Sequence, residues 1–220
     1  MTSNKIVVTY VTSSDYKIQE NMIVCSKVKL SNSLLVGDVF DFRIRQVPIK
    51  EVLEVDLTVM VLAEVTQAYS EIRVPCIVEH AGLIFEGLEH VSYPGGLTKP
   101  MWNALGKDFV EETQSEGRRV MARAVIAYCD GMTVKTFTGE TKGTICKFPR
   151  GARPFYWDPV FVPDNPDGTQ GTRTYAEIVD DVSLGLEYKV TALSQSTKAM
   201  VSFLEYRRTT GDCELWPPLG

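Results

Sequence analysis

The sequence predicts a single α/β domain with a central mixed sheet and flanking helices, because of the order in which its apolar periodicities occur. In the first half of the chain, short β-branched segments alternate with longer segments of helical periodicity. In the second half, two β-prone segments flank an Asp-Gly turn, as in an antiparallel hairpin. The 220 residues suffice for one generous domain, and no internal repeat or low-complexity linker divides them.

The first half begins with a predicted strand, helix and second strand. Residues 6–11 are a β-branched strand, and the small hydroxyl and acidic residues at 12–15 are suited to cap the helix that follows. A second strand begins near Gly37 and alternates apolar with charged side chains up to Val47-Pro48, where proline favours an extended preceding residue. Residues 54–69 predict a helix, because about four turns are too long for a buried strand.

The second half is predicted to complete the sheet. Residues 92–96 form a Pro- and Gly-rich loop, and residues 149–172, dense in Pro, Gly and aromatic side chains, predict an ordered functional loop. The expected elements are a strand at 74–79 with an apolar stretch to 85, a helix at 102–113, strands at 119–128, 132–137 and 143–147, a short strand at 160–161, and a helix at 194–208 that stops near Gly211.

Composition and charge exclude several classes of protein. Hydrophobic residues make up 44% and charged residues 23%, which excludes a disordered or fibrous chain. The net charge of −5 argues against a broad nucleic-acid-binding face. The longest apolar runs, such as residues 57–63, are too short to span a bilayer, and the N-terminus does not have the pattern of a signal peptide. We therefore expect a cytoplasmic protein without a membrane or nucleic-acid partner.

The cysteines and histidines do not form a metal-binding or disulfide pattern. The five cysteines are widely spaced and include no Cys-x-x-Cys pair, and His80 and His90 are the only histidines. We expect the thiols to be reduced and to fill the core.

Short sequence blocks in the second half carry a resemblance to a known family. In order, they are Pro149-Arg150-Gly151, the run Phe-Tyr-Trp-Asp-Pro-Val-Phe-Val-Pro at 155–163, and Thr-Tyr-Ala-Glu at 174–177. Together they resemble the inosine triphosphate pyrophosphatase family, whose members hydrolyse unusual purine nucleoside triphosphates to monophosphates and pyrophosphate. The resemblance implies two lobes around a nucleotide cleft.

Further segments fit this resemblance, which covers residues 5–205. Residues 78–83 are similar to the family's Val-Glu-Asp-Thr/Ser-Gly-Leu strand end. The first turn is similar to the family's phosphate-binding turn, with Lys17 in place and Ser14 where Asn is usual. The resemblance implies that Lys17, Lys99 and Arg150 are cations that neutralise a triphosphate. The implied domain is residues 1–208, followed by a tail at 209–220.

The implied chemistry requires acids at two positions that are altered here. Cleavage of a triphosphate needs Mg²⁺ held by carboxylates, and a base that takes a proton from water. Aligned by eye, Ile49 replaces one family acid and His80 replaces another, which leaves Glu79 as the implied catalytic residue and magnesium ligand. Glu51 or Glu54 would have to compensate for the lost acid, and His80 would be a substitute base near neutral pH.

The implied base-binding residues are partly retained. Phe155, Trp157 and Asp158 match family residues that flank and hydrogen-bond the base, although the two aromatic residues also suit a core. The family's Ser-His-Arg is Ser194-Gln195-Ser196 here, so that Gln195 remains as a donor to a base carbonyl. Stacking on an aromatic ring contributes about 1–3 kcal/mol per base, so binding could persist where catalysis fails.

The residues leave three hypotheses open. We favour a hydrolysis-impaired sensor that binds (d)ITP or XTP and signals to an effector, such as an NAD-consuming subunit in bacterial defence, because the losses fall on catalytic positions. The alternative is an active Mg²⁺-dependent pyrophosphatase that releases the monophosphate and pyrophosphate. A structural scaffold with an empty cleft is the third. The resemblance also implies a homodimer.

Overall fold

The computed structural model describes residues 5–152 and 155–210. Of the tail predicted at 209–220, residues 209–210 belong to the last helix, whereas the predicted stop at Gly211 and the rest of the tail lie outside the described residues. Within the described ranges, no helix is both long and apolar enough to cross a membrane.

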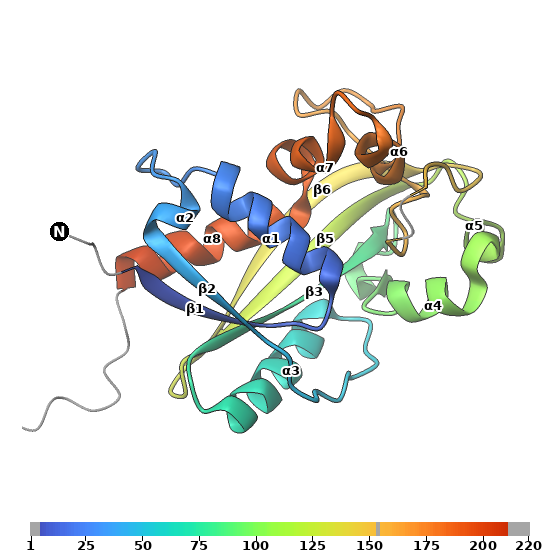
Figure 1. The fold of residues 1–220 in the computed structure, drawn as a ribbon. Helices are drawn as coiled ribbons and strands as arrows, with labels where there is room; N and C mark the ends of the chain where they lie inside the picture. Colours follow the sequence, from blue (N-terminus) through green and yellow to red (C-terminus); the bar gives the residue numbers. More distant parts are fainter. Residues whose placement is uncertain (1–4, 153–154, 211–220) are drawn as a thin grey trace, which may run out of the picture.

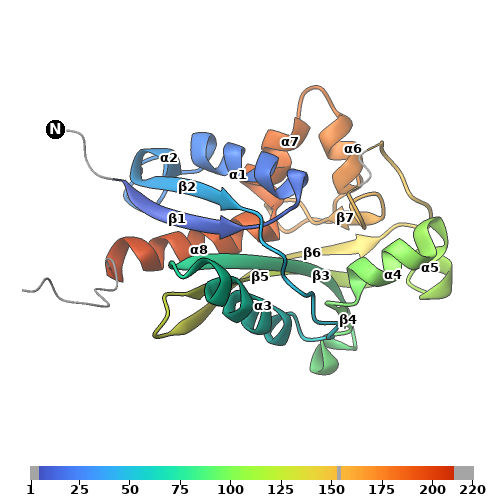
Figure 2. The ribbon, with the colours of Figure 1, turned by 60° about the horizontal axis from the view of Figure 1, so that its bottom comes forward.

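A seven-stranded mixed sheet runs through the centre of the molecule (Figures 1 and 2). Its strands are β1 (Ile6–Val11), β2 (Phe40–Arg45), β3 (Cys76–Phe85), β4 (Pro94–Gly95), β5 (Arg119–Cys129), β6 (Val134–Ile145) and β7 (Phe161–Pro163). The order is β2-β1-β3-β5-β6-β7, and β4 pairs with β3. Strand β1 pairs in parallel with β2 and β3, whereas β3, β5, β6 and β7 pair successively antiparallel.

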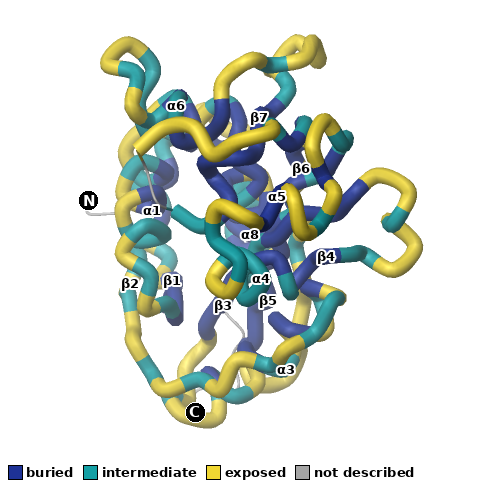
Figure 3. Tube along the Cα trace, turned by 90° about the vertical axis from the view of Figure 1, so that its right-hand side faces the viewer, coloured by how far each residue is buried: buried dark blue, intermediate teal, exposed yellow. Residues whose placement is uncertain are grey.

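Helices cover both faces of this sheet. They are α1 (Asp15–Lys27), α2 (Val36–Val39), α3 (Leu57–Ile72), α4 (Thr98–Leu105), α5 (Phe109–Glu112), α6 (Tyr175–Asp180), α7 (Gly185–Tyr188) and α8 (Gln195–Thr210), with a π-helical turn at Lys189–Leu193. Helices α1 and α8 pack on one face and α3 on the other (Figure 2). Buried residues follow the strands, and exposed residues lie mainly in the connections (Figure 3).

The alternation of side chains along β5 divides the core into two layers. Ala124, Ile126 and Tyr128 face α1 and α8, whereas Val125, Ala127 and Cys129 face α3. A third apolar cluster lies where β3 and β5 meet β7, α5 and α6, and it includes Phe109, Phe161 and Tyr175. This third cluster is the core of a second lobe. The predicted fold class, one α/β domain with a mixed sheet between helices, is confirmed.

Several predicted boundaries move for identifiable reasons. The helix predicted at 54–69 is α3, which begins later because the Asp56 side chain accepts a hydrogen bond from the Thr58 backbone N–H at 2.7 Å and caps it. The strand predicted at 74–79 continues through Gly82 to Phe85 as β3. Glycine is required at 82, because a Cβ there would lie 2.0 Å from the Gly95 carbonyl oxygen.

Other elements differ more from the predictions. The helix predicted at 102–113 is wrong: α4 begins at Thr98 and ends at Leu105, and Gly106, whose φ of 55° suits glycine, breaks the helix before α5. The two strands predicted at 132–137 and 143–147 are the single strand β6. The sequence predicts no helix between residues 173 and 193, yet α6, α7 and the π-helical turn lie there.

We expect Gly139→Ala to destabilise the fold, because α8 crosses β6 closely at this residue. A Cβ at Gly139 would lie 2.1 Å from the Gln195 carbonyl oxygen and 2.4 Å from the Ala199 backbone nitrogen, and neither can shift without the helix. Urea denaturation should show a loss of about 1–3 kcal/mol in the free energy of unfolding. The control, Thr138→Ala on the exposed face of the same strand, should change it by about 0.5 kcal/mol. Equal unfolding midpoints for the two variants would contradict the close contact.

Candidate active site

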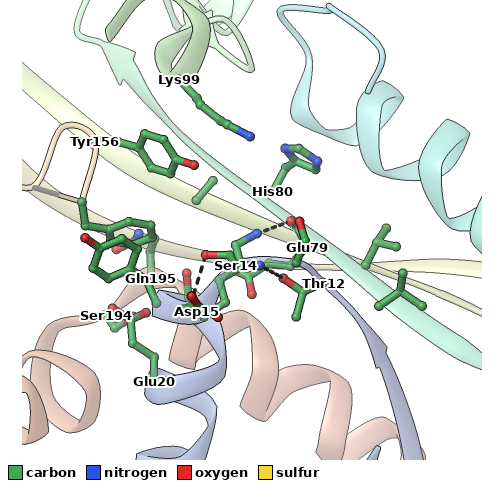
Figure 4. A pocket seen from close by; sticks show the side chains of 18 of the residues that line it. Thr12, Ser14, Asp15, Glu20, Glu79, His80, Lys99, Tyr156, Ser194 and Gln195 are labelled. Atoms are coloured by element: carbon green, nitrogen blue, oxygen red, sulfur yellow. Dashed lines mark hydrogen bonds between the residues drawn. The ribbon is translucent and has the colours of Figure 1, made fainter. Parts of the chain in front are cut away.

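A cavity of about 390 Å³ opens beside the carboxyl end of β1 and the middle of β3. Its lining comes from the start of α1, from α3, from the connection after β2, and from two segments near 155 and 195. All ten predicted site residues line it: Ser14, Lys17, Glu79, His80, Lys99, Phe155, Trp157, Asp158, Ser194 and Gln195. Lys99 and His80 lie at one end and Glu20 and Ser194 at the other (Figure 4).

The first turn of α1 presents donors to the cavity. The Ser14 hydroxyl accepts a hydrogen bond from the Lys17 backbone N–H at 3.4 Å and so caps the helix. The Lys17 ammonium donates to the Glu79 carbonyl oxygen, which holds the side chain across the floor of the cavity. A capped helix N-terminus and a lysine together favour an anion, although Asp15 in the same turn opposes it.

Glu79 is buried and only partly hydrogen-bonded. Its Oε2 accepts a hydrogen bond from the Tyr10 hydroxyl at 2.6 Å. Burial first, and then the Glu79 charge, raise the pKa of Tyr10 well above its usual range, so that Tyr10 remains a donor. The other carboxylate oxygen, Oε1, is buried and has no hydrogen-bond partner among the described residues.

His80 is joined to a glutamate that the sequence reasoning missed. Its Nε2 lies 2.5 Å from Oε2 of Glu64, which α3 places on a face otherwise formed by apolar residues such as Met60 and Val65. Glu64 is 3% exposed, and its Oε1 also lacks a partner within the described part of the chain. With Nε2–H donated to Glu64, Nδ1 is the ring nitrogen left to accept a proton. An acid within an apolar helical stripe was the available signal for Glu64.

The acid expected to compensate for Ile49 lines the cavity. Ile49 packs against the core beneath α3, and two residues later Glu51 lines the cavity with its Oε1 2.8 Å from the Lys99 ammonium. Burial alone would raise the pKa of Glu51, but the hydrogen bond and charge of Lys99 outweigh it and lower that pKa. Burial alone would lower the pKa of Lys99, but the hydrogen bond and charge of Glu51 outweigh it and raise that pKa. Both groups are therefore charged at neutral pH.

Two other expected residues do not line this cavity. The Glu54 carboxylate accepts a hydrogen bond from the Val55 backbone N–H at 2.6 Å and belongs to the loop before α3. Arg150 was expected near the phosphates, but its guanidinium donates to the Thr172 carbonyl oxygen at 3.0 Å and is not part of the lining. Arg150 instead joins two loops of the second lobe.

A buried ion network closes the opposite end of the cavity. The Lys189 ammonium lies 2.6 Å from Asp158 and 3.0 Å from Glu20, and all three residues are buried. The sequence reasoning missed Lys189 because it lies in the π-helical turn, outside any predicted element. Trp157 contributes to the cavity wall, but its ring packs mainly against Phe161 and Tyr175 in the core, with 5% exposure. Its expected role in stacking stays a prediction.

Ser194 and Gln195 are fixed by hydrogen bonds at the same end. The Ser194 hydroxyl accepts a hydrogen bond from the Thr197 backbone N–H at 3.2 Å. The Gln195 Oε1 accepts a hydrogen bond from the Tyr175 hydroxyl at 3.0 Å. Burial is the main cause that raises the pKa of Tyr175 well above its usual range. With its oxygen engaged, the Gln195 amide offers its NH₂ group as a donor.

Residues 8–199 match the Ham1 family. A dITP/XTP pyrophosphatase of Methanopyrus kandleri is 34% identical over 135 residues, which are 60% of this chain and 64% of that protein, so the match spans less than two thirds of that relative. An inosine triphosphate pyrophosphatase of Aspergillus fumigatus is 26% identical over 183 residues, 81% of this chain and 92% of that protein.

Solved structures show the same fold. The Ham1 protein of Staphylococcus aureus has a TM-score of 0.60 at 15% identity and covers 93% of this chain and 100% of its own. A HAM1 protein from Coxiella burnetii has a TM-score of 0.61 at 17% identity and covers 91% and 99%. These findings confirm the predicted resemblance, and the chain belongs to the Ham1 family.

Proposed function

We propose that this protein hydrolyses unusual purine nucleoside triphosphates, such as (d)ITP or XTP, to the monophosphate and pyrophosphate. The observation that carries the proposal is a pair of buried carboxylates in the cavity lining, Glu64 and Glu79, each of which has one buried oxygen, Oε1, without a hydrogen-bond partner among the described residues. Leaving such groups buried and unpaired destabilises a fold by about 1–3 kcal/mol each, or more when they are charged. A protein that only held a nucleotide would gain nothing from carboxylates that repel its phosphates.

Magnesium fits this set of donors. The described lining contains six acids and three lysines, namely Asp15, Glu20, Glu51, Glu64, Glu79, Asp158, Lys17, Lys99 and Lys189. This excess of negative charge disfavours a triphosphate unless a cation accompanies it. Mg²⁺ usually takes one or two protein carboxylates together with substrate phosphates and water. Glu79 and Glu51 are the residues that would hold it, and Mg²⁺ supplies charge neutralisation of the phosphates.

The remaining residues have distinct roles in this proposal. His80 takes the proton of the attacking water on Nδ1, while Glu64 accepts the Nε2–H and stabilises the imidazolium that forms. Lys17 and Lys99 hold the phosphates beside the first turn of α1. Phe155 stacks on the base, and the NH₂ group of Gln195 donates to a base carbonyl.

A sensor that binds the nucleotide without hydrolysing it is the second candidate. It is favoured by Ile49 and His80, which stand where the family resemblance implies acids. It would hold the nucleotide uncleaved and signal to an effector subunit by a change of shape, as would suit a defence module. The enzyme is the better supported of the two, because Glu51 lines the cavity near Ile49 and Glu64 supports His80. The relatives named dITP/XTP pyrophosphatases also favour it. The implied homodimer belongs to either proposal and is measured directly by light scattering.

With Mg²⁺ present, we expect the protein to release pyrophosphate and monophosphate in equal amounts from dITP, ITP or XTP, and much more slowly from ATP. Chelation of the metal should abolish the release, because the acidic cavity then repels the phosphates. Pyrophosphate detection and calorimetric binding, run side by side, decide between the candidates. Binding of ITP without turnover would support the sensor, and neither binding nor turnover would support the scaffold.

We expect Glu64→Gln to lower kcat by about 10²- to 10⁴-fold, because His80 would lose the carboxylate that orients and stabilises it. His80→Ala should have a similar effect, and the double variant should be no worse than His80→Ala alone, since the two residues act as a unit. The matched control is Glu71→Gln, which removes an exposed carboxylate from the same helix and should leave kcat unchanged. A fully active Glu64→Gln variant would remove Glu64 and His80 from the mechanism.

A further inference from the structure

Two aromatic rings from distant parts of the chain stack on each other inside the cavity. The Tyr16 and Phe155 ring centroids are 4.6 Å apart, and their planes are inclined by 28°. Tyr16 belongs to the first turn of α1 and Phe155 to the segment before β7, and both line the cavity. This pair is separate from the core stack of Trp157, Phe161 and Tyr175.

The Phe155 ring also lies close to a cation that is fixed in place. The Lys189 ammonium lies 5.1 Å from the centroid of the Phe155 ring, and Asp158 and Glu20 fix it there at 2.6 and 3.0 Å. Tyr16 already covers one face of the ring by stacking. A base that stacks on this face of Phe155 must therefore displace the Tyr16 ring or insert between the two rings.

The backbones that carry the two rings are both held in place. Tyr16 follows the Ser14 cap of α1. The carbonyl oxygen of Phe155 accepts a hydrogen bond from the Asp158 backbone N–H at 3.0 Å. The next residue, Tyr156, has a φ of 45°, which is rare for an aromatic residue. The spacing between the rings can therefore change most readily by rotation about side-chain torsions.

We propose that Tyr16 is the second wall of an aromatic clamp, and that the purine base inserts between Tyr16 and Phe155. Stacked planes need about 3.5–4.0 Å each, so the two rings must part to about 7–8 Å to admit a base. The contact between the rings is then replaced by two contacts with the base. A purine, with two fused rings, covers more of both walls than a pyrimidine does. This inference rests on the proposed function and adds the residue that favours purines in the same site.

The test measures binding of two probes by calorimetry: the α,β-methylene analogue of ITP, which cannot be cleaved at the scissile bridge, and inorganic tripolyphosphate. Tyr16→Ala and Tyr16→Leu should each raise the Kd for the analogue about 5- to 150-fold, the range expected for one lost base stack. The Kd for tripolyphosphate should stay within about twofold, because the clamp does not touch phosphate. Tyr16→Phe, which keeps the ring, should bind the analogue as the wild type does.

Phe148→Ala is the control, since Phe148 is 66% exposed and lies outside the cavity lining. An unchanged Kd for the analogue in both Tyr16→Ala and Tyr16→Leu would overturn the clamp. Equal loss of both probes would also overturn it, because it would indicate a structural role for Tyr16. A wild-type protein that binds tripolyphosphate but not the analogue would instead overturn the proposed function, and the clamp with it. Melting temperatures of the variants verify that each is folded.

Discussion

The pleat of β3 at Glu79 and His80 is the constraint on which the site depends. Successive side chains of a strand point to opposite faces of the sheet, so Glu79 reaches Tyr10 on the layer of α1 and α8, whereas His80 reaches Glu64 on α3. Both layers of the core therefore contribute to one cavity. A shift of register by one residue would exchange these partners and bury each side chain in the wrong layer.

The site was predictable in large part: ten predicted residues line one cavity, whereas the expected residues Glu54 and Arg150 do not. Lys189 and Tyr16 were not predicted, because their partners Asp158 and Phe155 lie far away in the sequence. Glu64 did carry a signal, as an acid within an apolar helical stripe, but its partner His80 lies on a different element. The sequence left Glu51 and Glu54 as alternatives to the acid expected at Ile49. The structure brings Ile49 and Glu51 to the cavity lining but not Glu54, and this difference depends on the course of the backbone after Pro48, which no local pattern predicts.

The fold, like the site, was predictable in some elements and not in others. Periodicity located β1, β5 and α8 closely, because their apolar patterns are long and regular. It failed at residues 189–193, where the Ser194 backbone N–H donates to the Lys189 carbonyl oxygen at 2.9 Å, five residues back. This π-helical turn adds one residue to the helical repeat, which no 3.6-residue pattern can predict. The extra residue separates Lys189 from Ser194 by a full π turn at the end of the cavity where both are needed.

Electrostatics divides the cavity into two ends with different tasks. At one end, Lys189 offsets Asp158 and Glu20 within hydrogen-bond distance, so that the wall is rigid and nearly balanced in charge. At the other, the described part of the chain offers no partner to one buried oxygen of Glu64 and one of Glu79, so that this wall carries unbalanced negative charge. In the proposed function, the base binds at the first end, and the proton and phosphate chemistry takes place at the second. Because few groups of the lining belong to both ends, the proposed recognition of the base and the proposed cleavage of the phosphate chain depend on different side chains, and a substitution at one end leaves the other end in place.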